Sequence, residues 1–242
     1  MASAALAQQP RREIRVAAAA DLQPVLPALA DRYEKVTGGK LIISYGSSGN
    51  LTTQILNGAP MDLFLGADFV FPEKIVAAGL ADSTAPTQYA RGTLVLWARK
   101  DSPLQPITLD SLLDKRVTAV AIANDLRAPY GQAAVAALKR LKMYDKVKPR
   151  LVVAENIAQA AQFVESGNAQ LGFISLTAAS TPRFQSEGTF VRVPRSSYAP
   201  IVQCAVIMKN SDRKAEAHAF LEWLLKPEVQ SSLEPMGLEP VH

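Results

Sequence analysis

The alternation of hydrophobic and polar residues predicts short buried strands, each followed by a tight turn and an amphipathic helix. The clearest unit joins the apolar run 41–43 to a helical pattern at 51–56 through the turn Tyr45-Gly46-Ser47-Ser48-Gly49-Asn50. Similar units surround it, with strands at 14–18 and 61–65 and helices over 22–37 and 72–78. Repeated strand–turn–helix units indicate an α/β domain with a mainly parallel sheet.

The second part of the chain repeats this pattern. We predict strands at 117–122, 151–153 and 171–174, and helices over 132–142 and 157–166. Two long apolar strands, near 87–99 and 201–208, have no helix before them, so we expect them to carry the chain between two domains. The predicted domains are therefore a first lobe of residues 12–91 and 200–242 and a second lobe of residues 92–199.

Composition narrows the class of protein. The 242 residues are 48% hydrophobic and 20% charged, as in soluble globular proteins. The net charge is +4, but Lys and Arg are scattered and form no basic stripe with aromatics, so we expect no nucleic-acid partner. The single cysteine, Cys204, lies in an apolar run and is interpreted as a core residue.

The first residues are interpreted as targeting sequence. Ala5-Leu6-Ala7 fits the small-residue pattern at which secretory signals are cleaved. The charged and apolar parts of a signal do not precede it, so residues 1–11 are interpreted as a signal remnant, and the protein is predicted to be periplasmic. The alternative is an alanine-rich tail. Either interpretation leaves residues 1–11 outside the fold.

The residues that most catalytic sites require are scarce. The two histidines, His218 and His242, lie near the C-terminal end and away from the turns, so a nucleophile would lack its base. No spacing of His, Cys and carboxylates suggests a metal-ion site, and no glycine-rich phosphate motif occurs. We therefore expect neither an enzyme nor a resident cofactor.

The turns that follow the strands indicate an anion site instead. In a parallel sheet such turns lie beyond the carboxyl ends of the strands, where ligands bind. Helix N-termini carry unpaired N–H groups and partial positive charge, so they attract anions. If two lobes face each other, the turns converge on one cleft. The turns are Ala20-Asp21, Ser47-Ser48, Pro129-Tyr130-Gly131, Asn156-Ile157 and Ser175.

Several segments together carry a family resemblance. The most specific is Asn57-Gly58-Ala59-Pro60-Met61-Asp62-Leu63-Phe64, followed by Gly66-Ala67-Asp68. The others are residues 16–22, Gly46-Ser47-Ser48-Gly49, 94–97, Ala128-Pro129-Tyr130-Gly131, Glu155-Asn156-Ile157 and 171–173. From about residue 14 onward the chain resembles the periplasmic molybdate-binding proteins of ABC transporters. The resemblance implies a two-lobed type II periplasmic-binding fold, each lobe a mainly parallel sheet flanked by helices, with a tetrahedral oxyanion held between them.

Carried over by position, the resemblance implies a set of site residues and a partner. The ligand would be molybdate or tungstate, held through its oxygen atoms without direct metal-ion ligands, and the partner would be the membrane permease of an importer. A monomer is expected. The implied contacts are Ala20, Asp21, Ser48, Tyr130 and Ile157, with Ser47, Arg127, Asn156 and Ser175 as supporting residues.

The chain departs from the family pattern at two positions. Family members usually carry Ser, Thr or Asn where this chain has Ala20-Asp21. Some use a tyrosine at the position of Ser175 and others one near Tyr130, and this chain follows the second pattern. An ionised Asp21 would repel a dianion, so we expect it to cap its own helix, with Arg127 as a partial screen. The alternatives are pairing with a cation and protonation when ligand binds.

Two other functions remain open from the residues alone. The chain fits a receptor for another small anion, such as sulfate, phosphate or an organic acid, and an enzyme on the same scaffold is the other alternative. Molybdate and tungstate are both tetrahedral dianions of nearly equal size, so the sequence does not distinguish them.

Overall fold

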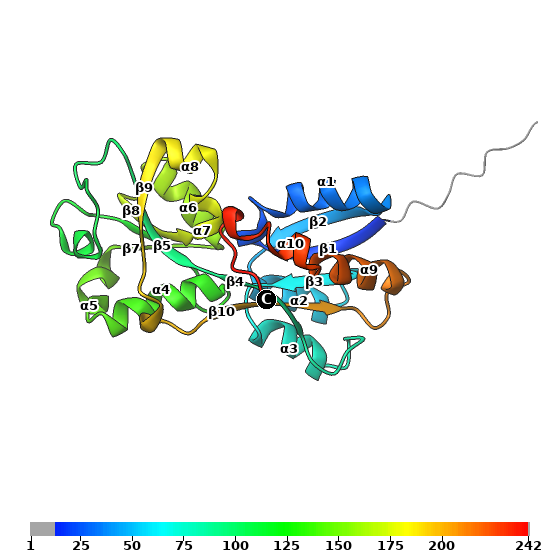
Figure 1. The fold of residues 1–242 in the computed structure, drawn as a ribbon. Helices are drawn as coiled ribbons and strands as arrows, with labels where there is room; N and C mark the ends of the chain where they lie inside the picture. The colour runs from blue at the N-terminus through cyan, green and yellow to red at the C-terminus, as the bar shows by residue number, and fades with distance from the viewer. Residues whose placement is uncertain (1–12, 242) are drawn as a thin grey trace, which may run out of the picture.

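The structure is a computed structural model that describes residues 13–241. The predicted signal remnant at 1–11 lies outside these residues. The described chain forms two lobes, each built on one five-stranded sheet. In Figure 1 the first lobe is blue and cyan, with the C-terminal helices in orange and red, and the second lobe is green and yellow. The predicted two-lobed α/β fold is confirmed.

The first sheet has the strand order β2-β1-β3-β10-β4. Its strands are β1 (Glu13–Ala19), β2 (Lys40–Gly46), β3 (Leu63–Gly66), β4 (Thr87–Gly92) and β10 (Ile201–Ile207). Its helices are α1 (Leu26–Thr37), α2 (Ser48–Leu56), α3 (Val70–Ala77), α9 (Lys214–Leu224) and α10 (Pro227–Gln230), with short 3-10 turns η1 (Ala20–Leu22) and η5 (Glu234–Met236).

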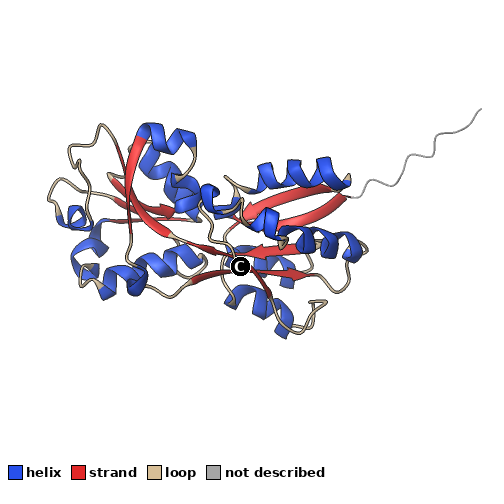
Figure 2. Ribbon diagram, in the orientation of Figure 1, coloured by secondary structure: helices blue, strands red, loops and turns tan. Residues whose placement is uncertain are grey.

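The second sheet has the order β7-β6-β8-β5-β9. Its strands are β5 (Leu94–Arg99), β6 (Val120–Ala123), β7 (Leu151–Ala154), β8 (Leu171–Ser175) and β9 (Gly188–Arg192). Its helices are α4 (Pro129–Arg140), α5 (Tyr144–Val147), α6 (Ile157–Glu165), α7 (Leu176–Ala179) and α8 (Pro182–Glu187), with 3-10 turns η2 (Leu109–Leu113), η3 (Lys148–Arg150) and η4 (Arg195–Ser197). Helices flank both sheets, as Figure 2 shows.

Each sheet contains one strand that runs against the others. In the first sheet β1 pairs in parallel with β2 and β3, whereas β10 is antiparallel to both β3 and β4. In the second sheet β6 pairs in parallel with β7 and β8, whereas β5 is antiparallel to β8 and β9. β5 and β10 are the strands through which the chain enters each lobe. An antiparallel strand needs no helical crossover, which explains why no helix precedes either.

The predicted long strand at 87–99 is two strands that belong to different sheets. β4 ends at Gly92, β5 begins at Leu94, and the buried Thr93 lies between them. The chain therefore crosses between lobes here and returns through the segment before β10. The domain boundaries at residues 92 and 200 stay a prediction.

Hydrophobic packing joins the two lobes as well as filling each one. One core cluster contains Ala19, Ala20 and Ala67 of the first lobe together with Tyr130 and Ile157 of the second. These alanines let the lobes approach closely, which leaves room for a small ligand only. Cys204 is buried on β10, as its interpretation as a core residue requires. None of the helices in residues 13–241 is long and apolar enough to cross a bilayer.

Candidate functional site

Turns from both lobes converge on one small pocket between them. They follow β1, β2 and β3 in the first lobe and β6 and β7 in the second. The cavity is about 10 Å³, close to the room that one water molecule needs, so a larger ion requires the lobes to separate slightly. The lining residues are Ala20, Asp21, Gly46, Ser47, Ser48, Ala67, Ala128, Pro129, Tyr130, Asn156 and Ile157. All five implied ligand contacts are therefore together in one place.

The two serines of the first lobe lie at the start of α2. Ser47 is the N-cap, and its hydroxyl accepts the Asn50 N–H at 3.4 Å. The Ser48 hydroxyl accepts the Ala67 N–H at 3.0 Å. A hydroxyl that accepts one hydrogen bond keeps its own proton to donate. Ser48 is buried at the pocket wall, so that proton is a suitable donor to an anion.

The second lobe contributes two helix N-termini. α4 begins at Pro129, and α6 begins at Ile157 with Asn156 as its N-cap, whose side chain accepts the Gln159 N–H at 3.0 Å. The N–H groups of Tyr130 and Ile157 lie in the first turns, where a helix provides no acceptor of its own. They also lie at the positive ends of the helix dipoles. The Ile157 side chain is buried in the core, so only its N–H is suited to bind a ligand.

Asp21 does not cap a helix, and that prediction is wrong. It lies in η1, whereas α1 begins at Leu26 and places Pro27 in its first turn. The helix therefore starts too far along the chain for Asp21 to reach its N–H groups. Instead, Asp21 Oδ2 accepts hydrogen bonds from the Tyr130 phenol at 3.1 Å and from the Gln203 side-chain amide. The carboxyl thus links η1 to a helix of the second lobe and to a crossing strand.

Burial dominates the electrostatics of this cluster. Asp21 is 1% exposed, and burial raises its pKa to about 6, although the hydrogen bonds from Tyr130 and Gln203 oppose this effect. Burial also raises the pKa of Tyr130 well above its ordinary value, and the nearby Asp21 adds to the rise. In the described part of the chain, no Lys, Arg or His lines the pocket. A bound anion would be held by neutral donors and helix dipoles, not by a cation.

Arg127 lies outside the pocket lining, and its predicted role as a screen for Asp21 is wrong. Its guanidinium lies 3.3 Å from Asn50 Oδ1 and 3.5 Å from Thr53 Oγ1, both on α2. Its carbonyl accepts the Gly49 N–H at 2.8 Å, and Asn50 also donates to Glu155 at 3.1 Å. These four hydrogen bonds form a clasp across the mouth of the cleft.

Ser175 also lies outside the pocket lining. Its hydroxyl accepts the Ala178 N–H as the N-cap of α7 and lies 2.8 Å from Thr177 Oγ1. Thr177 in turn donates to the Asp21 carbonyl at 2.6 Å. Ser175 therefore reaches the site only through Thr177 and the backbone of η1.

Sequence reasoning missed two residues of this cluster. Gln203 is fully buried. In the sequence it is marked only by being a polar residue within the apolar run that forms β10. Gly92 was not marked by any pattern, yet a Cβ there would lie 2.2 Å from the Tyr130 hydroxyl oxygen. Only a residue without a side chain lets the phenol lie against the strand that leaves the first lobe.

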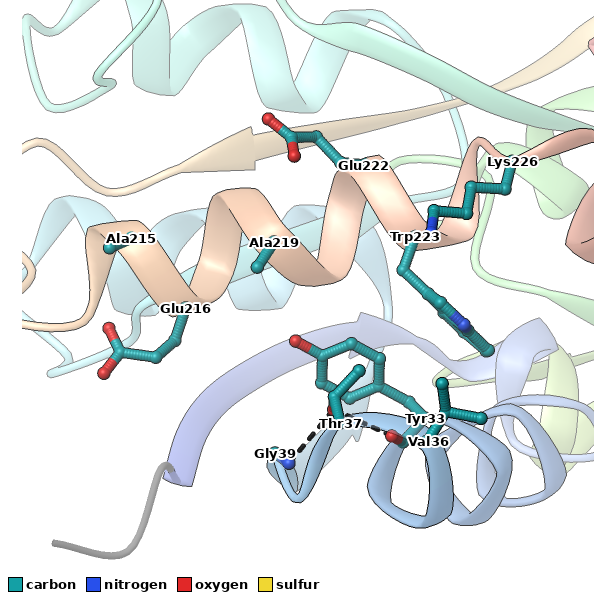
Figure 3. Close-up of a pocket in the computed structure, with 10 residues that line it drawn as sticks. All are labelled: Tyr33, Val36, Thr37, Gly39, Ala215, Glu216, Ala219, Glu222, Trp223 and Lys226. Atoms are coloured by element: carbon teal, nitrogen blue, oxygen red, sulfur yellow. Dashed lines mark hydrogen bonds between the residues drawn. The ribbon is translucent and has the colours of Figure 1, made fainter.

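A larger pocket lies elsewhere and lacks the features of an anion site. It measures about 560 Å³ and lies between α1 and α9 of the first lobe, over Tyr33 and Trp223 (Figure 3). Glu216 and Glu222 are part of its wall, and none of the implied site residues lines it. With two carboxylates against the single cation of Lys226, the lining disfavours an anionic ligand.

Comparison with known proteins identifies the family. The profile described as bacterial extracellular solute-binding protein matches residues 14–239, nearly the whole described chain. This chain belongs to that family. Among its relatives is the molybdate-binding protein ModA of Azotobacter vinelandii, 37% identical over 226 residues, which are 93% of this chain and 89% of the relative. ModA of Rhodobacter capsulatus is 34% identical over 93% of this chain and 87% of its own length.

Solved structures of solute-binding proteins show the same architecture. The periplasmic molybdate-binding protein of Azotobacter vinelandii superposes with a TM-score of 0.89 at 35% identity, covering 95% of this chain and all of that chain. The two lobes and the cleft between them are therefore those of a solute-binding protein. The cleft pocket, unlike the larger pocket on the first lobe, lies beyond the carboxyl ends of parallel strands, where ligands bind in open α/β sheets.

Proposed function

We propose that this chain captures molybdate, or tungstate, and delivers it to the membrane permease of an ABC importer. The observation that carries the proposal is the convergence of helix N-termini from both lobes on one pocket lined by neutral donors. Two relatives whose names state molybdate binding are 37% and 34% identical to this chain over the aligned residues. We propose that Ala20, Asp21, Ser48, Tyr130 and Ile157 contact the oxygen atoms of the anion.

The donor set suits a fully deprotonated oxyanion. Ser48 supplies a hydroxyl, and α4 and α6 supply N–H groups at their positive ends. Each hydrogen bond to a charged group contributes roughly 1.5–3 kcal/mol, so four or five support micromolar or tighter binding once the costs of ordering and desolvation are subtracted. The alanines at the pocket wall limit the ligand to a compact ion.

The rest of the role follows from the family. We propose that the protein works in the periplasm as a monomer and binds its solute without changing it. In support, no group of three His, Cys, Asp or Glu side chains within residues 13–241 is placed to hold a metal ion. Within the described residues, the histidine His218 lies on α9 against Asp82 and not beside the hydroxyls of the pocket.

Thermal unfolding with a panel of sodium salts tests the proposal. A ligand that binds only the native state raises the melting temperature by mass action. We expect molybdate and tungstate to raise it strongly, and sulfate, phosphate and citrate at equal concentration to raise it much less. Sodium chloride at matched ionic strength is the control for salt effects. Equal shifts from every oxyanion would refute the molybdate assignment, and a shift from citrate alone would indicate an organic-acid receptor.

A further inference from the structure

The cluster around Asp21 lacks a hydrogen-bond donor. Two side-chain oxygens of this cluster, Asp21 Oδ1 and Gln203 Oε1, are buried acceptors without a hydrogen-bond partner. The donors of the cluster, the Tyr130 phenol and the Gln203 amide, both bond to the same oxygen, Asp21 Oδ2. A buried acceptor left without a donor is costly. One additional proton on the carboxyl would add a donor to the cluster.

Among residues 13–241, no positively charged side chain compensates an ionised Asp21. The groups that face it are neutral: Tyr130 from α4, Gln203 from β10, Thr177 from α7 and the buried Tyr89 from β4. On α6, which also packs against η1, the acidic residue Glu165 is paired with Arg183. No basic side chain lines the pocket. A dianion would therefore enter beside a buried carboxylate with no cationic side chain in the pocket lining to offset the repulsion.

We propose that the pocket takes up its anion together with one proton, which resides on the Asp21 carboxyl. The proton comes from the solvent, so the bound complex contains the deprotonated anion and a neutral carboxylic acid. This inference rests on the proposed function, because it concerns the same pocket.

The proton also changes what Tyr130 can do. Against an ionised Asp21, the phenol donates its only proton to Oδ2. A protonated Asp21 can donate to the phenol oxygen instead, which frees the phenol proton for an oxygen of the anion. The hydrogen bond between Asp21 and Tyr130 then has the opposite direction. Proton uptake thus removes a repulsive charge and turns a pocket-lining tyrosine into a donor to the ligand.

Burial favours the uptake of a proton by the Asp21 carboxyl. Its pKa is already raised to about 6 in the free protein, and a neighbouring dianion raises it further. Between pH 7 and pH 8.5 the free protein has an ionised Asp21 and the complex a protonated one. We therefore expect the molybdate affinity to fall about tenfold per pH unit over this range, or about 30-fold in total.

Isothermal titration calorimetry with sodium molybdate tests the proposal. Titrations at pH 8.0 in HEPES and in Tris, whose ionisation enthalpies differ, give the number of protons taken up per anion. We expect about one for the parent protein and none for Asp21→Asn, whose affinity should also be constant from pH 7 to pH 8.5. Asn has the size of Asp and donates without a proton from solvent.

Asp68→Asn is the matched control. Asp68 is a partly buried carboxyl whose pKa burial also raises to about 6, but it lies outside the pocket lining, and its side chain accepts the Phe71 N–H at 3.1 Å. Asn also caps helices, so this variant should fold and keep both the proton uptake and the pH slope.

The outcomes separate the two proposals. Molybdate binding by the parent protein without proton uptake, and with affinity constant over this pH range, would overturn the proton inference and leave the proposed function intact. Proton uptake that persists in Asp21→Asn would overturn the assignment to this residue. Failure of the parent protein to bind molybdate at any pH would overturn the proposed function and, with it, the inference.

Discussion

Replacement of Asp21 by Asn should stabilise the protein in the absence of any anion. In the native state burial raises the pKa of Asp21 to about 6 from an ordinary value of 3.8. At neutral pH the folded protein therefore contains an ionised carboxylate that would be better solvated in the unfolded chain. Each pKa unit corresponds to about 1.36 kcal/mol, so the burial of this charge costs about 3 kcal/mol. Asn removes the charge and keeps the shape.

The sign of the pH dependence follows from the direction of the shift. Because the folded state binds the proton more tightly, the contribution of Asp21 to stability is fully present below about pH 4 and is lost as the pH rises to about 6. Above this pH both states are ionised and the loss is constant. Asp21→Asn should therefore exceed the parent protein in stability by about 3 kcal/mol at pH 7 to 8, and by progressively less as the pH falls toward 4.

Urea unfolding at several pH values between 4.5 and 8 measures this difference directly. For a chain of this length the same difference corresponds to a rise in melting temperature of about 6–12 °C at pH 7. Asp31→Asn is the control, since Asp31 is exposed on α1 and its replacement should produce no such pH-dependent difference. A variant less stable than the parent protein at pH 7, or a difference that does not change with pH, would refute the reasoning.

Three further results should follow. Ser48→Ala and Tyr130→Phe should each weaken molybdate binding by roughly 1.5–3 kcal/mol in calorimetry, because each removes one donor to the anion; parent-like binding in both would place the site elsewhere. Arg127→Ala removes the hydrogen bonds that the Arg127 side chain makes to α2 in the clasp. Stopped-flow displacement should therefore show faster molybdate release with little change in the association rate; a slower association rate alone would contradict this role of the clasp. Small-angle scattering should show compaction when molybdate is added, because two-lobed proteins of this kind close around their ligand by hinge motion; an unchanged radius with ligand bound would contradict this motion.

Much of the fold could be predicted because it depends on local signals. Periodicity located the strands, and N-cap chemistry located the starts of α2 and α6, where Ser47 and Asn156 accept N–H groups of their own helices. The prediction of one continuous strand over residues 87–99 was wrong in one respect. A continuous apolar run does not reveal that its two halves pair in different sheets, since pairing depends on distant strands and not on the run itself.

The candidate site was harder to predict where it depends on long-range contacts. The turn residues could be grouped because parallel strands place their carboxyl ends together. The environment of Asp21 could not be predicted, because its hydrogen-bond partners are 109 and 182 residues away in sequence. Local capping was the natural expectation for an Asp after a strand, but the later start of α1 and the approach of Tyr130 and Gln203 decided otherwise.

The hydrogen bond from the Gly49 N–H to the Arg127 carbonyl joins the backbones of the two lobes directly. The amide lies in the first turn of α2, where the helix offers no acceptor, so its acceptor belongs to the opposite lobe. A Cβ at Gly49 would lie 2.9 Å from that carbonyl oxygen, which shows how closely the backbones approach.

Each separation of the lobes exposes this amide to solvent. Its rate of deuterium exchange therefore depends on the population of the open state, because protection exists only while the cleft is closed. Residue-resolved exchange at Gly49, measured with and without solute, gives the fraction of time that the cleft is open. The molecule thus contains its own reporter of the motion that admits and releases its cargo.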